Sequence, residues 1–199
     1  MAHELTKTDK MVYYGQKPWH GLGIEMPNLM TAKEAFDAAF GWRVEQKELY
    51  IRHGNEFLPV TGSWRANVRS DNFESVGIVT DAYQVLQPEK AFEFFDEVTM
   101  DPNGPKYVTA GSLKGGRKMW LLAKMPDFIQ IADKDRYEDY LLLSNSFDGS
   151  TAVEILWTPV RVVCNNTLTI ALNQAGSQKF KMRHFPSIAK AKSAWDFLG

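Results

Sequence analysis

Two arginines at alternate positions in one short segment give the clearest chemical signal in this sequence. In residues 63–69, apolar side chains alternate with Arg65, Asn67 and Arg69. Because successive side chains of a strand point to opposite faces, a strand here places the two guanidinium groups on one face, about 7 Å apart. That spacing and the planar arginine fork suit successive phosphates of a nucleic-acid backbone. The segment predicts phosphate contacts from Arg65 and Arg69; ion pairs with acidic residues of a neighbouring strand are the alternative.

Three further cations alternate with apolar residues near the C-terminal end. Lys179, Lys181 and Arg183 fall on one face of a strand over 178–185, and Phe180 and Met182 fall on the other. This pattern places charge beside surfaces on which bases could stack. An edge strand protected by lysines against aggregation has the same pattern.

A glycine pair between two predicted strands carries three more cations, Lys114, Arg117 and Lys118. Glycines in such a position suit the mirror-image turns of hairpins, and the loop lacks the closing Lys-Ser/Thr pair of a phosphate-binding loop. We therefore expect these cations to contact phosphate from a hairpin tip. Trp64 and Tyr83 are expected to support the sheet or to stack a base.

Cys164 and Asp148 are the residues around which an enzyme could be built. Cys164 precedes a probable helix start, where a thiolate would be favoured, but its valine neighbours indicate a buried, inert thiol. Asp148 precedes a glycine, as expected of a hairpin turn. We predict no catalytic residues, no metal site and no cofactor; a nucleic-acid-modifying or hydrolytic centre near Cys164 and Asp148 is the alternative.

The elements that must position these residues indicate an α+β fold, with antiparallel meanders packed by a few helices. Residues 1–30 are rich in aromatics, Gly and Pro and predict an irregular arm. Residues 31–101 predict a helix–meander–helix core, with Thr31 and Glu34 as a capping box. Residues 106–199 predict a hairpin-rich second half with C-terminal helices.

Composition excludes several classes of protein. The chain has 199 residues, 44% of them hydrophobic and 24% charged, as in ordinary globular domains. No apolar run approaches the length of a spanning helix, the start lacks a signal peptide, and a single cysteine cannot form an internal disulfide. We expect a cytoplasmic protein without membrane partners.

The formal net charge of −1 hides a positive C-terminal segment, with six basic residues and one acid from Arg161 onward.

Several motifs together resemble a known family. They are Trp-His-Gly-Leu-Gly at 19–23, Arg-Ser-Asp at 69–71, Val-Thr-Asp-Ala-Tyr at 79–83, Ala-Gly-Ser-Leu at 110–113, Gly-Gly-Arg at 115–117, Asp-Gly-Ser at 148–150 and Arg-Val-Val-Cys-Asn-Asn-Thr-Leu at 161–168. This pattern resembles the prokaryotic phage/plasmid-like protein family, a domain of unknown function carried by phages, prophages and plasmids. Members are typically longer, so the resemblance implies that the chain is truncated.

The order of elements from 31 to 98 is similar to the core of the single-strand annealing proteins, the eukaryotic Rad-group protein and the phage proteins Redβ, RecT and Erf. This resemblance implies a ring or filament whose positive groove holds single-stranded DNA by its backbone. The sequence hypothesis is therefore a phage or plasmid recombination protein that binds and anneals single-stranded DNA as a homo-oligomer, without covalent catalysis. Besides the enzyme, the alternative is a phage interaction protein that blocks a host factor through its N-terminal arm.

Overall fold

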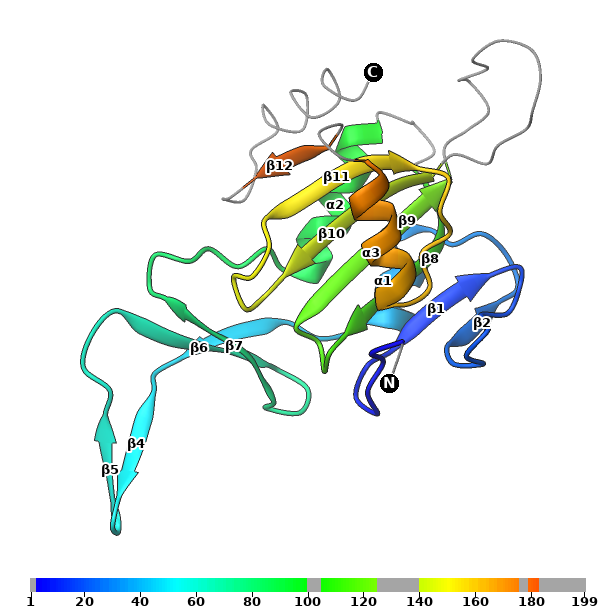
Figure 1. The fold of residues 1–199 in the computed structure, drawn as a ribbon. Helices are drawn as coiled ribbons and strands as arrows, with labels where there is room; N and C mark the ends of the chain where they lie inside the picture. Colours follow the sequence, from blue (N-terminus) through cyan, green and yellow to red (C-terminus); the bar gives the residue numbers. More distant parts are fainter. Residues whose placement is uncertain (1–2, 100–104, 125–139, 176–178, 183–199) are drawn as a thin grey trace, which may run out of the picture.

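A seven-stranded sheet forms the body of the protein in the computed structural model, which describes residues 3–99, 105–124, 140–175 and 179–182 (Figure 1). Together with its helices it gives the α+β class that the sequence predicts. The strand order is β12-β11-β10-β9-β8-β1-β2, with only the β1–β2 pair parallel. The strands are β1 (Met11–Tyr14), β2 (Ile24–Met26), β8 (Lys106–Leu113), β9 (Lys118–Lys124), β10 (Tyr140–Ser146), β11 (Val153–Thr158) and β12 (Phe180–Met182).

Both faces of this sheet are covered, which explains why its central strands are almost entirely buried. On one face pack α1 (Ala32–Ala39) and α2 (Pro88–Thr99), and on the other α3 (Asn165–Gln174), drawn in front of the sheet in Figure 1. Leu121 and Leu143 point into the first core, and Leu122 and Leu142 point into the second. All four side chains are fully buried, as expected for strands between two layers.

Helix α1 begins and ends where local sequence signals predict. The Thr31 hydroxyl accepts a hydrogen bond from the Glu34 backbone N–H, and the Glu34 carboxylate accepts one from the Thr31 N–H, which completes a capping box. Gly41 follows the helix with a φ of +67°, a conformation that only glycine adopts without strain. Within the described ranges, no helix is long and apolar enough to cross a membrane.

A smaller sheet lies beside the body and carries a projecting hairpin. Its strand order is β3 (Val44–Lys47), β6 (Trp64–Arg69) and β7 (Ser75–Thr80). The Gln87 side-chain amide donates to the Val44 carbonyl and accepts from the Val44 N–H, and so ties β3 to the start of α2. Between β3 and β6, strands β4 (Tyr50–His53) and β5 (Glu56–Pro59) form a two-stranded hairpin that extends away from the body (Figure 1).

The structure differs from the expected organisation in two respects. Residues 11–14 and 24–26 of the expected irregular arm are strands of the main sheet, and Val12 is fully buried there. Residues 31–99 do not form a core of their own, because Phe40 and Phe95 share one core with Leu121 and Ile155 of the main sheet. The predicted helix near the C-terminus lies outside the described residues.

Candidate functional site

The inner face of β6 carries the two arginines of the strongest sequence signal. Arg65, Asn67 and Arg69 share a face, as predicted, but this face packs against the body. Arg69 is 1% exposed; it donates to both carboxylate oxygens of Asp71, at 2.9 and 2.7 Å, and to the Thr8 carbonyl at 3.0 Å. Its guanidinium also lies 4.5 Å from the centre of the Trp42 ring. Arg69 is therefore committed to contacts inside the protein and has no free face for a phosphate.

The turn between β8 and β9 binds a carboxylate from another part of the same chain. The backbone N–H groups of Gly115 and Gly116 both donate to the Asp9 carboxylate at 2.8 Å, and the Ser112 hydroxyl donates to it as well. The Lys114 ammonium lies 3.1 Å from the Glu4 carboxylate. The glycine pair thus cradles an internal carboxylate, and Lys114 is neutralised.

The cations of β12 gather around one buried acid. The ammonium groups of Lys179 and Lys181 lie 3.4 and 3.0 Å from the same oxygen of Glu154, and Lys179 also donates to the Leu172 carbonyl. The alternative prediction for this segment was an edge strand whose lysines protect it against aggregation, and lysines that pair with a carboxylate of the next strand fit that alternative. Arg183 lies outside the described residues.

Three of the predicted cations belong to segments next to the turn that joins β10 to β11, residues 147–150. The Phe147 N–H donates to the Arg117 carbonyl, and the positive charge of Lys118 acts on the Asp148 carboxylate. Arg65 pairs across the strands with Val79, whose side chain lies 3.9 Å from an ideal Cβ position at Gly149. In the described part of the chain, none of these three cations forms an ion pair. We call this group, Arg65, Arg117, Lys118 and the turn 147–150, the turn site.

Tyr83 and Asp148 hold the turn in place rather than acting as an acid and a base. The Tyr83 hydroxyl donates to the Ser146 carbonyl at 2.7 Å. Burial and the nearby Asp148 charge raise the pKa of Tyr83 to about 12, so the hydroxyl keeps its proton. Burial opposes ionisation of Asp148, but hydrogen bonds from Ser150 and Ser146 outweigh it and lower the pKa of the carboxyl. Asp148 is thus an anion bound within its own turn.

Trp64 lies on the opposite face of β6 from Arg65 and is 48% exposed. On that outer face it accompanies Ile78 of β7, which is 58% exposed. The two residues expected to support the sheet or stack a base therefore lie apart. Tyr83 contacts Ser146 beside the turn site, and Trp64 lies on an exposed surface on the other side of β6.

Cys164 and Asp148 do not form one centre. Cys164 is fully buried at the start of α3, where its sulfur lies 3.6 Å from the Thr167 hydroxyl. Phe147, next to Asp148, belongs to the core on the other face of the sheet from Cys164. Among the described residues, no group of three or more His, Cys, Asp and Glu side chains could hold a metal ion.

Two polar residues that organise the turn site were not singled out from the sequence. Asn67 is fully buried and donates its side-chain amide to the Phe147 carbonyl at 2.6 Å, linking β6 to the β10–β11 turn. Asp9 anchors the neighbouring β8–β9 turn from more than a hundred residues away. An Asn between two arginines on one face of a strand was the available signal for the first; the second had none.

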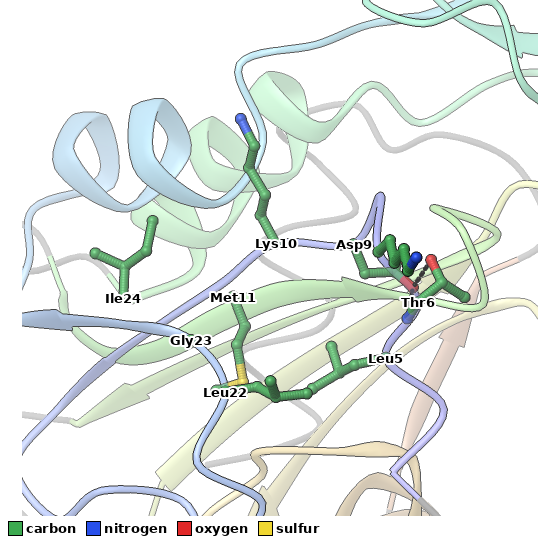
Figure 2. A pocket seen from close by; sticks show the side chains of 9 residues that line it. Leu5, Thr6, Asp9, Lys10, Met11, Leu22, Gly23 and Ile24 are labelled. Carbon is green, nitrogen blue, oxygen red and sulfur yellow. Dashed lines mark hydrogen bonds between the residues drawn. The ribbon is translucent and has the colours of Figure 1, made fainter. Parts of the chain in front are cut away.

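A hollow of about 320 Å³ lies between the N-terminal loop and β2 (Figure 2). Its apolar side consists of Leu5, Met11 and Leu22, which lie close together in the figure, whereas Lys10 points away. Its polar residues Thr6 and Asp9 hydrogen-bond each other. The hollow therefore offers apolar contact but no free polar group pointing into it that would select a ligand.

The fold and the turn site together define a mixed α+β protein with three cations near one turn and a buried cysteine. The chain belongs to the family described as Domain of unknown function (DUF932), whose model matches residues 75–199. No curated protein and no solved structure matches the chain.

Proposed function

We propose that this protein binds single-stranded DNA through the turn site and anneals complementary strands as an oligomer, without covalent catalysis. The observation that supports this proposal is the group of three cations, Arg65, Arg117 and Lys118, around one turn with no ion-paired carboxylate. Contacts to phosphate alone hold a strand without using its bases, which leaves those bases free to pair. The proposed setting is the cytoplasm of a host cell that carries a phage or plasmid, as the resemblance of the motifs at 69–71, 79–83, 115–117 and 148–150 implies.

The proposed surface is smaller than the cationic track expected from the sequence. Arg69, Lys114, Lys179 and Lys181 have carboxylate partners, so we assign them no phosphate contact. Three phosphate contacts per chain give weak binding, and several chains along one strand are then needed for high affinity.

The test is the salt dependence of binding to a fluorescein-labelled oligothymidine, measured by fluorescence anisotropy. Each phosphate contact to a single strand contributes about 0.7 to the slope of log affinity against log salt. The triple variant Arg65→Ala, Arg117→Ala, Lys118→Ala should therefore reduce the slope by about 2 and weaken binding at low salt.

A matched control removes the same charge from elsewhere on the surface. Arg43, Lys33 and Lys90 are exposed and ion-paired to Glu89, Asp37 and Glu93. The variant Arg43→Ala, Lys33→Ala, Lys90→Ala should leave the slope unchanged. Equal slopes for the two triple variants, or no binding by the unaltered protein at low salt, would reject the proposal.

A further inference from the structure

The β4–β5 hairpin exposes large apolar side chains on both of its faces. The paired residues Ile51 and Leu58 lie on one face, and Tyr50 and Phe57 lie on the other. These four side chains are between 41% and 69% exposed. The hairpin extends away from the body (Figure 1), and among the described residues its two strands have their main contacts with each other. An isolated two-stranded ribbon is only marginally stable in water, so a hairpin of this composition needs a covering surface.

A second apolar surface lies on the outer face of the three-stranded sheet. Trp64 and Ile78 are both about half exposed there, with Val68 beside them on the same face. The only charged pair described on this face is Lys47 with Glu45, which neutralise each other at 2.6 Å. We call this surface the outer face.

Charge favours another protein surface over a nucleic acid on the hairpin. Residues 45–65 contain three acids, Glu45, Glu48 and Glu56, and three bases, Lys47, Arg52 and Arg65. A neutral, apolar ribbon does not attract a polyanion, and its own outer face is equally neutral and apolar. The hairpin extends away from the body of its own chain (Figure 1), so its exposed apolar side chains are available to the outer face of another copy.

We propose that the hairpin of one copy packs on the outer face of the next copy, in a head-to-tail arrangement. Such a contact is heterologous, so it continues from copy to copy until a ring closes or a filament grows. The proposal supplies the interface for the oligomer in the proposed function, but it does not depend on nucleic acid being present.

The area of this contact predicts weak, concentration-dependent assembly. The exposed apolar parts of the hairpin and the outer face together amount to at most roughly 700 Å². One such contact is below the range of about 1,200–2,000 Å² that a stable pair buries. Each contact is therefore expected to form only as the protein concentration rises.

Sedimentation velocity of the full chain without nucleic acid tests the interface. We expect the unaltered protein to form species larger than a dimer as its concentration rises from about 1 to about 100 μM, where contacts of this area become populated. The variant Ile51→Ser, Leu58→Ser and the variant Ile78→Ser should each remain monomeric. Ile170 on α3 is exposed to 46%, so Ile170→Ser is a matched control that should still assemble.

Mixing the two monomeric variants tests the head-to-tail geometry. The hairpin variant keeps an intact outer face, and the outer-face variant keeps an intact hairpin, so a mixture should give 1:1 dimers that grow no further. Circular dichroism of each variant controls for folding. A monomer at every concentration, or assembly that survives either variant, would overturn the proposal.

The binding experiment separates this proposal from the proposed function. If an interface variant no longer assembles but keeps the salt slope of the unaltered protein per chain, the turn site is retained as the DNA-binding surface. If the Arg65, Arg117, Lys118 triple variant no longer binds DNA but assembles as the unaltered protein does, the proposed interface is retained.

Discussion

At the residue scale, burial decides what each arginine of β6 does. Arg65 and Arg69 share one face of the strand, and the alternation of the sequence correctly predicts this. At the end near Arg69 that face meets Trp42 and the N-terminal loop, whereas Arg65 is half-buried, with its guanidinium bonded to the carbonyl of Trp64. Which face of the strand is buried depends on how two sheets pack together, and the alternation alone contains no such information.

Replacing Arg69 should destabilise the fold strongly. The Arg69→Ala variant leaves Asp71 and the Thr8 carbonyl without their donor, and it opens a cavity against Trp42. Loss of one partner from such a pair costs about 3 kcal/mol. Urea unfolding near neutral pH measures the change. Arg43→Ala, which breaks an exposed pair with Glu89, should cost less than about 1 kcal/mol and is the control. Similar small losses in both variants would show that Arg69 is not a structural residue.

The same pair predicts how stability responds to acid. Burial opposes ionisation of Asp71, but the hydrogen bonds and charge of Arg69 outweigh it and hold the pKa of the carboxyl below its usual value. The stabilisation from this pair is fully present above about pH 3.9, the pKa of an Asp in the unfolded chain. It is lost as the pH falls through the lower pKa that Asp71 has in the folded protein. Asp71→Asn should therefore lose less free energy of unfolding than the unaltered protein between about pH 5 and about pH 2. An identical loss in the two proteins, measured by urea unfolding at each pH, would contradict this assignment.

At the scale of elements, Gly77 allows β7 to touch the β10–β11 turn. A Cβ atom at this position would lie against the Cα of Asp148 and 2.7 Å from the Phe147 carbonyl oxygen. Both neighbours are backbone atoms, so neither can move aside alone. Gly77→Ala should lower the free energy of unfolding by about 2 kcal/mol or more and weaken DNA binding by displacing the turn.

Gly54 at the hairpin tip provides the comparison for Gly77. It has a φ of +60° and no atom within 4 Å of an added Cβ, so Gly54→Ala costs only backbone strain of about 1 kcal/mol. Thermal unfolding of both variants, together with their anisotropy titrations, measures the two effects. Equal destabilisation would mean that the contact at Gly77 does not constrain the turn.

The elements that the sequence predicts correctly are those defined by local signals. The capping box at Thr31, Pro88 at the start of α2 and the glycine turns of the hairpins each act within a few residues. Strand β1 has only four residues, and its pairing with β8 joins segments about a hundred residues apart. The turn site is predicted only in part for the same reason. Arg117 and Lys118 can be recognised from the sequence as cations of a glycine turn, but their separation in space from Arg69 and Lys181 depends on the tertiary arrangement.

At the scale of the whole molecule, the family match and the folding unit have different boundaries. The match covers 75–199, yet β1 and α1 lie before it and complete the main sheet and its core. Without them β8 loses its β1 partner, and the core loses Val12, Phe40 and Trp42. Removing buried aromatic side chains of this size costs about 3–5 kcal/mol each, comparable to the whole stability of a domain.

A fragment of residues 75–199 should therefore not fold by itself. We expect it to show no cooperative thermal transition, weak near-ultraviolet circular dichroism and strong binding of a hydrophobic dye, whereas the full chain should unfold cooperatively and bind little dye. Adding a separate fragment of residues 1–74 should restore the near-ultraviolet signal, because β1 and α1 would again cover the sheet. A cooperative transition in the isolated 75–199 fragment would show instead that the preceding residues are an addition to an independent domain, and that the turn 147–150 folds without Asp9 and Asn67.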